Sequence, residues 1–233
     1  MSDVAIAALA SRACGLLLAV GSDLLIPDHE AQDALAADGE DAGCRSALLR
    51  TFTRWDSAHF LLVAQHGWSR HEWSHAFFPL YPLLLRAGGW ALAPVARTLA
   101  LCPQERFVLA GLLISNAAFV VAACALHALG RRVVGDPALA RTAALLFCAS
   151  PASVFFSSVY TESCFAAATF GGALLLARGR PWAATASLVV ASATRANGVL
   201  GALLVCHHGV ARALRQPRRS TRTAVRRVAS RST

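Results

Sequence analysis

The chain has 233 residues, of which 56% are hydrophobic and only 15% are charged, and its mean hydropathy is +0.50. Soluble domains usually carry about 25% charged residues, so this composition excludes an ordinary water-soluble domain and favours a membrane protein. The net charge is +9, and every basic side chain other than histidine is arginine.

Six apolar stretches are long enough, or nearly long enough, to cross a bilayer as a helix, which takes about 20 residues. In chain order they are residues 4–26, 76–96, 107–130, 142–160, 163–177 and 181–206. Lipid offers backbone groups no water to bond with, and the alternation typical of a barrel strand is missing, so we expect helices. The sequence therefore predicts an all-α, polytopic bundle of about six spans over residues 1–210.

Charged residues interrupt three of these stretches. Arg12 and Asp23 lie eleven positions apart, or three helical turns, and share one face of the first stretch. We expect Arg12, near the end of its span, to extend to the membrane surface. Arg86 and Arg195 are candidate site residues, because a guanidinium at membrane depth suits a phosphate. Extension to the surface, or pairing with an acid such as Glu162, is an equal alternative.

Two polar segments suggest how the chain crosses the membrane. The loop 27–75 begins with acidic residues and is expected on the luminal side, whereas the tail 211–233 carries eight arginines and no acid. A disordered cytoplasmic flank explains that tail better than nucleic-acid binding does. Arg131 and Arg132 conflict with this count, since they follow the third stretch and would face the lumen. If they are cytoplasmic, one earlier apolar segment is re-entrant, and the sequence leaves this open.

The densest group of polar and aromatic residues is Arg54-Trp55-Asp56-Ser57-Ala58-His59-Phe60. Read as a helix, it places Trp55, His59 and Phe60 on one face. Amphipathic segments rich in Trp and Phe lie at the membrane interface, so Asp56 would stand where a lipid-borne donor meets a water-borne acceptor. The alternative is an interfacial aromatic belt with a solvated aspartate.

Two further polar breaks interrupt the apolar stretches, at Tyr160–Ser163 and at Arg195–Gly198. Polar breaks at membrane depth are tolerated where they line a cavity or pack on protein, so both indicate a site without defining its chemistry.

His71-Glu72-Trp73-Ser74-His75 matches H-E-x-x-H, the zinc motif of metalloproteases. Pro79 limits a helix here, and no third ligand follows at metalloprotease spacing. The seven cysteines form no C-x-x-C pair, so we expect no disulfide framework and no metal. A membrane zinc protease remains the alternative enzyme class.

Several motifs occur in a fixed order along the chain. They are Leu25-Ile26-Pro27-Asp28-His29, Arg54-Trp55-Asp56-x-x-His59-Phe60, Ala64-x-x-Gly67, Ala76-Phe77-Phe78-Pro79-Leu80-x-Pro82, Ser115-Asn116, Leu146-Phe147-Cys148-x-x-Pro151-Ala152, Tyr160-Thr161-Glu162-Ser163 and Arg195-x-Asn197-Gly198. In this order they resemble the GPI mannosyltransferase 2 family of GT-C glycosyltransferases. The resemblance runs from about residue 25 to residue 200.

The resemblance implies a multi-pass enzyme of the endoplasmic reticulum membrane with a GT-C-like bundle. Such an enzyme transfers the second mannose, in α-1,6 linkage, from dolichyl-phosphate mannose to a GPI-anchor precursor. It needs no cofactor and no nucleic acid, and it suggests a small membrane partner subunit. The family pattern places Trp55 and Asp56 in the first luminal loop as catalytic residues.

One carboxylate suffices for this reaction, because dolichyl phosphate leaves as a stable anion and needs no general acid. We therefore expect Asp56 to be the base, with Arg86 or Arg195 neutralising the phosphate. The candidate substrate-binding residues are His59, Arg86, Glu162, Arg195 and Asn197. Family members are usually much longer, so a truncated member is expected, and an inactive fragment is the third alternative.

Overall fold

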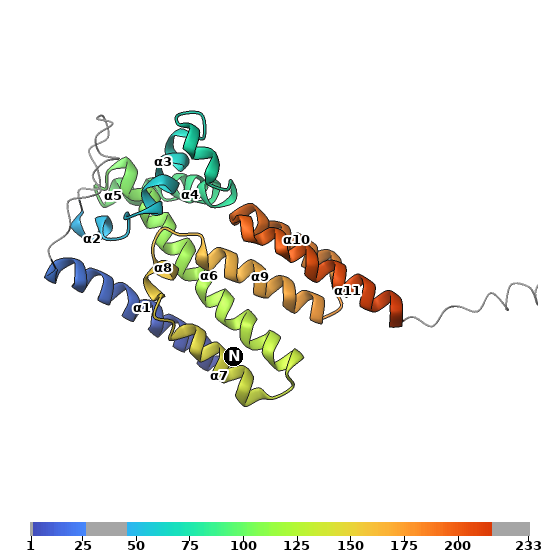
Figure 1. Cartoon of the computed structure of the whole chain (residues 1–233). Coiled ribbons are helices and arrows are strands. Elements are labelled where there is room, and N and C mark those ends of the chain that lie inside the picture. Colours follow the sequence, from blue (N-terminus) through green and yellow to red (C-terminus); the bar gives the residue numbers. More distant parts are fainter. Residues whose placement is uncertain (1, 27–45, 216–233) are drawn as a thin grey trace, which may run out of the picture.

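The computed structural model describes residues 2–26 and 46–215, and within these ranges it contains helices and no strand (Figure 1). The predicted all-α fold is therefore confirmed for this part of the chain. In chain order the elements are α1 (Ser2–Leu25), α2 (Ala47–Arg50), α3 (Asp56–His66), η2 (Glu72–Ala76), α4 (Leu80–Ala91), α5 (Ala93–Thr98), α6 (Pro103–Val133), α7 (Pro137–Cys148), α8 (Ser153–Ser157), α9 (Glu162–Ala177), α10 (Pro181–Thr194), η3 (Ala196–Leu200) and α11 (Gly201–Arg215), where η marks a 3-10 helix.

Two of the described helices are long and apolar enough to cross a bilayer. They are α1, with 23 qualifying residues from Asp3 to Leu25, and α6, with 31 residues. The stretch 142–160 is divided between α7 and α8, and the stretch 181–206 is divided among α10, η3 and α11. The expected six spans thus stay a prediction beyond α1 and α6. The acidic residues 28–41 and the tail from residue 216 lie outside the described residues.

Proline marks the start of three long helices. Pro103, Pro137 and Pro181 are the first residues of α6, α7 and α10, where a missing backbone N–H leaves no helical bond unmade. The Glu105 carboxylate accepts hydrogen bonds from the backbone N–H groups of Cys102 and Ser46, at 2.8 and 2.7 Å. It thereby caps α6 and attaches the chain before α2 to the same end of that helix.

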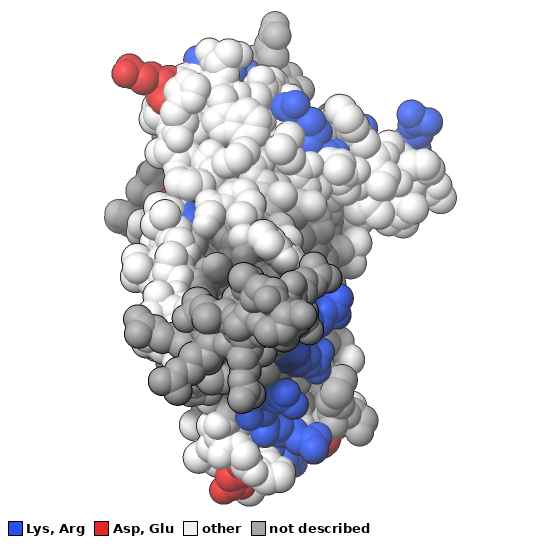
Figure 2. Space-filling model, turned by 90° about the vertical axis from the view of Figure 1, so that its right-hand side faces the viewer, with Lys and Arg blue, Asp and Glu red and all other residues white. Residues whose placement is uncertain are grey.

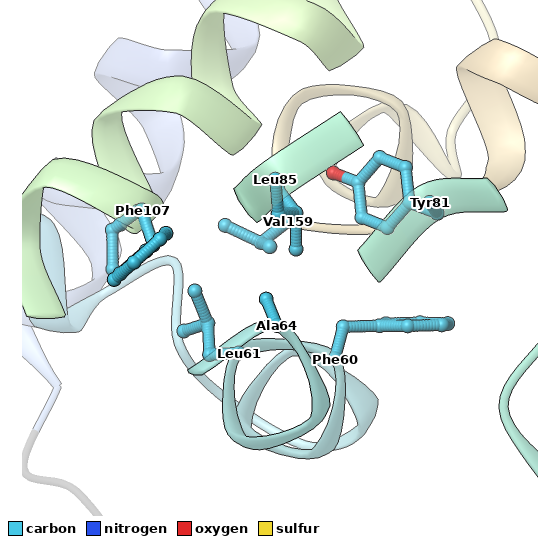
Figure 3. Packing of buried hydrophobic residues seen from close by; sticks show 8 residues of the cluster. Phe60, Leu61, Ala64, Tyr81, Leu85, Phe107 and Val159 are labelled. Carbon is cyan, nitrogen blue, oxygen red and sulfur yellow. The ribbon is translucent and has the colours of Figure 1, made fainter. Parts of the chain in front are cut away.

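One hydrophobic cluster joins α3 to the helices beneath it (Figure 3). Leu61 and Ala64 of α3 lie against Leu85 of α4, Phe107 of α6 and Val159 of the turn before α9. A second cluster joins α1, α6 and α7 through Val4, Ala8, Phe119, Ala123 and Ala144. Close van der Waals packing of this kind favours helix association in a bilayer, so these clusters hold α3 and α1 against the common helix α6.

Charged residues lie at both ends of this bundle. At one end, Asp3 of α1 pairs with Arg141 of α7 at 3.0 Å, and Arg132 of α6 donates to the carbonyl of Ala177 at the end of α9. We call this the arginine end, because Arg131, Arg132, Arg178 and Arg180 lie there. We call the other end, which carries α2 to α5, the Asp56 end (Figure 1). Figure 2 shows basic side chains toward the top and a denser group of them toward the bottom of this face, with mostly uncharged described residues elsewhere.

The stretch 76–96 does not run from one end to the other. It forms α4 and α5, of 12 and 6 residues, and both pack beside the first half of α6. Of the two arrangements left open by the sequence, this geometry matches the re-entrant one. As a result, Arg131 and Arg132 lie at the same end as the amino-terminal part of α1, and the turns at Tyr160 and Arg195 lie at the Asp56 end.

The turn after α10 depends on a close approach of two backbone segments. A Cβ atom added at Gly198 would lie 2.3 Å from the backbone nitrogen of Ser192.

Gly198→Ala should therefore destabilise the protein by about 1–3 kcal/mol, seen as a lower thermal unfolding midpoint in detergent. Gly209→Ala is the matched control, since no atom lies within 4 Å of its added Cβ. It should be neutral or stabilising by up to about 1 kcal/mol. Equal midpoints for both variants would contradict this packing.

Candidate functional site

The backbone at Trp55 is strained. Helix α3 begins at Asp56, and the preceding Trp55 has φ 55° and ψ −132°, a conformation that bulky residues rarely adopt. Trp55 is 69% exposed, whereas Phe60 is buried. The prediction that Trp55 shares a helical face with His59 and Phe60 is wrong, because the helix starts one residue later.

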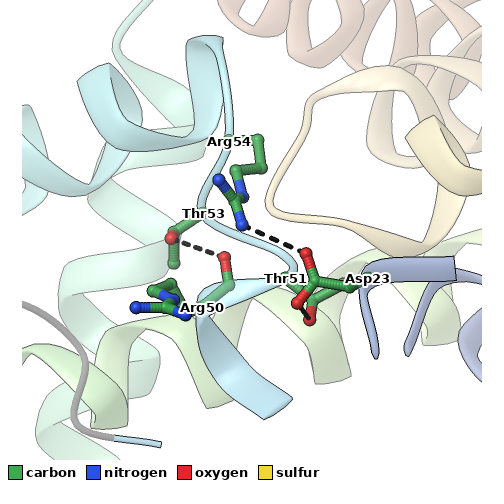
Figure 4. A network of polar contacts seen from close by, with 5 residues as sticks. All are labelled: Asp23, Arg50, Thr51, Thr53 and Arg54. Atoms are coloured by element: carbon green, nitrogen blue, oxygen red, sulfur yellow. Dashed lines mark hydrogen bonds and ion pairs between the residues drawn. The ribbon is translucent and has the colours of Figure 1, made fainter. Parts of the chain in front are cut away.

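Bonds to the neighbouring residue Arg54 keep the strained backbone of Trp55 in place (Figure 4). Asp23, near the end of α1, lies 3.1 Å from the Arg54 guanidinium and accepts a 2.9 Å hydrogen bond from Thr51. From the opposite side, the Tyr160 hydroxyl donates to the Arg54 carbonyl at 3.2 Å. We call Asp23, Thr51 and Tyr160 the Arg54 clamp. The clamp fixes both the side chain and the carbonyl of the residue before Trp55.

Asp56 is exposed at the first position of α3. Its carboxylate forms no ion pair with any residue of the ranges 2–26 and 46–215. It lies close enough to Tyr160 to influence that phenol: burial, followed by the charges of Asp56 and Glu162, raises the pKa of Tyr160 to about 12. The two predicted carboxylates, Asp56 and Glu162, thus both act electrostatically on one tyrosine.

Glu162 and Arg195 form an ion pair between α9 and α10. Pairing with an acid was one of the two alternatives for Arg195, and it is the observed one. The Glu162 Oε1 atom accepts from Arg195 Nη1, while Glu162 Oε2 is buried without a hydrogen bond to a described residue. The pair remains accessible, with side chains 26% and 36% exposed. Asn197 is exposed two residues beyond Arg195.

Arg86 points to the carboxyl end of α3. Its Nε atom donates to the Ala64 carbonyl at 2.6 Å, and its Nη2 atom donates to the Val63 carbonyl at 3.4 Å. The Val63 carbonyl also accepts from the Gly67 backbone N–H, and a cation at the last turn interacts favourably with the helix dipole. Arg86 therefore stabilises the helix that begins with Asp56, and its proposed contact with substrate stays a prediction.

His59 lies one turn after Asp56, on the same face of α3. Its ring packs edge-on against Trp73, with centroids 4.5 Å apart, and stacks on Phe77 at 5.1 Å. The His59 Nδ1 atom is buried and has no hydrogen-bond partner in the described part of the chain. The segment 71–77 thus covers one side of α3 beside the candidate base.

The same segment lacks the geometry of a zinc protease. Glu72–Ala76 is a 3-10 helix, and His71 precedes it in an extended conformation. The two histidines of H-E-x-x-H share a face only on an α-helix, and here the His71 ring stacks on Trp73 at 4.8 Å. Within residues 2–26 and 46–215, no three His, Cys, Asp or Glu side chains come together as metal ligands.

Polar residues beneath the clamp connect it to the helices. The Tyr81 hydroxyl and Ser115 Oγ are 2.8 Å apart, and Ser115 Oγ lies 3.3 Å from the Tyr160 carbonyl.

The sequence singled out Asp23 as a charge in a span, and Tyr160 as part of a polar break, but assigned neither of them to the Trp55 segment. Side chains this far apart along the chain carry no sequence signal of their contact.

An open pocket of about 500 Å³ lies beside the clamp, between α1 and the segment 151–154. Gly15, Leu18 and Ser22 line it along one face of α1, and Val154 lines the opposite wall. Asp23 and Thr51 also line it, so an apolar pocket adjoins the polar contacts that hold Arg54.

Comparisons with known proteins place these features in a family. The GPI alpha-1,6-mannosyltransferase 2 of Rattus norvegicus is 38% identical over 205 residues, which cover 86% of this chain and 41% of that protein. The human protein of the same name is 37% identical over 204 residues, with the same coverage. The GPI mannosyltransferase 2 of Drosophila melanogaster is 31% identical over 170 residues, which cover 68% of this chain and 36% of that protein.

The chain thus spans about two fifths of the length of these curated relatives. No solved structure gives a significant match. The family model described as Mannosyltransferase (PIG-V) matches residues 3–230, which is almost the whole sequence. The chain therefore belongs to the PIG-V mannosyltransferase family.

Proposed function

We propose that this protein transfers mannose in α-1,6 linkage from dolichyl-phosphate mannose to a GPI-anchor precursor. The observation that carries the proposal is the presentation of Asp56: an exposed carboxylate follows a strained, clamped tryptophan at one end of an apolar bundle. Curated relatives named GPI alpha-1,6-mannosyltransferase 2 support the choice of reaction.

In this reaction Asp56 takes the proton of the acceptor hydroxyl. The hydroxyl oxygen then forms a bond to the anomeric carbon of the donor mannose as the bond from that carbon to the phosphate oxygen breaks. The electron pair of the broken bond leaves with dolichyl phosphate, so no acid is needed there. A single displacement of this kind inverts the configuration at the anomeric carbon.

Arg195 is the better candidate than Arg86 for the leaving phosphate. Arg86 donates to α3, whereas Arg195 lies beside Glu162, whose charge acts on the same tyrosine as that of Asp56. His59 and Asn197 are proposed to bind the sugars. Donors aimed at the departing oxygen are effective because they are held in place before the reaction.

The endoplasmic reticulum membrane is the proposed location, with the Asp56 end in the lumen. The arginine end would then face the cytoplasm. The apolar pocket beside α1 suits the lipid part of a substrate. A small membrane partner subunit and further spans belong to the same proposal.

Asp56→Asn tests the base. Loss of the carboxylate should lower mannose transfer by about 10²- to 10⁴-fold, measured with labelled dolichyl-phosphate mannose in membranes that lack the endogenous enzyme. Glu72→Gln is the matched control. Glu72 is another exposed acid of the same loop, and it would be the base of a zinc protease. This variant should retain activity. An active Asp56→Asn protein would refute the assignment.

Arg195→Gln and Glu162→Gln separate two roles of the ion pair. Both changes break the pair and should lower the unfolding midpoint to a similar degree. If Arg195 also contacts the leaving phosphate, Arg195→Gln should lower kcat by about 10²- to 10³-fold more than Glu162→Gln does. Equal losses of kcat would show that Arg195 acts only through Glu162.

The Tyr160 phenol should keep its proton throughout the working pH range. Its pKa rises from 10.0 to about 12 on folding, so its stabilising contribution is fully present below pH 10 and is lost as the pH rises through about 12. In a pH titration, the tyrosinate absorbance of the natural protein minus that of Tyr160→Phe reports the ionisation of Tyr160. This difference should show no ionisation near pH 10 until denaturant is added. Tyr81→Phe should leave this difference unchanged. Ionisation near pH 10 in the folded protein would contradict the burial of Tyr160.

A further inference from the structure

A buried cation lies inside the bundle, away from the site described above. Arg12, in the first half of α1, is only 3% exposed. Its guanidinium carbon lies 3.7 Å from the centre of the Phe119 ring. The expectation that Arg12 extends to the membrane surface is therefore wrong. No carboxylate of the described residues pairs with it, although a buried charge is costly without a partner.

Arg12 instead binds neutral acceptors on α8. Its Nη1 atom donates to the Ser153 carbonyl and to Ser157 Oγ, both at 2.8 Å. Its Nη2 atom donates to Ser153 Oγ at 2.5 Å and to Ser11 Oγ at 3.0 Å. The planar guanidinium group of Arg12 has several N–H donors and can therefore contact both ends of the five-residue helix α8.

Helix α8 leads directly to the clamp. Only two residues separate Ser157 from Tyr160, whose hydroxyl binds the Arg54 carbonyl. Other bonds hold the same segment: Asn116 Nδ2 donates to the Ser157 carbonyl, and Ser163 Oγ donates to the Phe156 carbonyl. The continuous path therefore runs from Arg12 through α8 and Tyr160 to the residue before Trp55.

Helix α1 consequently contacts Arg54 by two routes. Asp23 binds the guanidinium directly, whereas Arg12 acts on the carbonyl through α8 and Tyr160. We infer that Arg12 is a positioning residue, which sets the place of Asp56 by fixing α8 and Tyr160 against α1. As far as it concerns catalysis, the inference rests on the proposed function, but the placement of the Trp55 segment can be measured without any activity.

Hydrogen exchange of the purified chain in detergent or nanodiscs tests the placement. In Arg12→Met, amides of residues 153–160 and of residues 54–58 should exchange about tenfold faster, while those of α4 should not change. Arg12→Lys should give a smaller effect, since it keeps the charge but loses the planar guanidinium group. Arg141→Met is the matched control: it removes another arginine bonded to α1, but one that is exposed and far from α8.

Kinetics add a second readout for membranes with mannosyltransferase activity. Arg12→Met should lower kcat and leave KM for the donor nearly unchanged, because Asp56 is misplaced and the donor contacts are not. Ser157→Ala removes a single acceptor of Arg12 and should show the same pattern more weakly; it serves if Arg12→Met does not fold. Faster exchange confined to residues 153–160, or no change at all, would overturn the inference. An inactive natural chain would count against the proposed function alone, because the exchange result is independent of it.

Discussion

The site depends on one constraint, the fixing of Arg54 from two sides. A bulky residue with positive φ costs about 1–3 kcal/mol and persists only where the surroundings hold it. Here Asp23 holds the Arg54 side chain and Tyr160 holds its carbonyl. A neutral hydrogen bond such as that of Tyr160 contributes about 0.5–1.5 kcal/mol, and a partly exposed ion pair such as Asp23 and Arg54 contributes about 0–1 kcal/mol. The bonds are thus of the size needed to maintain the Trp55 conformation.

The arrangement of the bundle explains how distant segments meet at this place. Because α4 and α5 stay at one end of α6, the helices that follow return to the Asp56 end at Tyr160 and again at Arg195. Asp56, Glu162 and Arg195 therefore lie at the same end of the molecule. In the proposed transfer, this one-sided geometry would let both lipid-linked substrates bind at the same face of the bilayer.

Arginines with the same sequence signal have different surroundings. Arg12, Arg86 and Arg195 each interrupt an apolar stretch, yet one is buried against α8, one binds the end of α3, and one pairs with an acid. The difference arises because a guanidinium in an apolar setting takes whatever acceptors the packing brings near it. Of these three, Arg195 lies beside Glu162, whose charge acts on the same tyrosine as that of Asp56.

The sequence alone determined the helical class, the long apolar helices α1 and α6, and the family, and it singled out Trp55 and Asp56 as candidates, because these depend on composition, on short motifs and on their order. The tertiary structure decided that the stretch 76–96 stays at one end, that α3 begins after Trp55, and that Asp23 and Tyr160 hold Arg54. It also decided that Arg12 is buried. Each of these facts depends on contacts between residues far apart along the chain, and such contacts leave no mark in a local pattern.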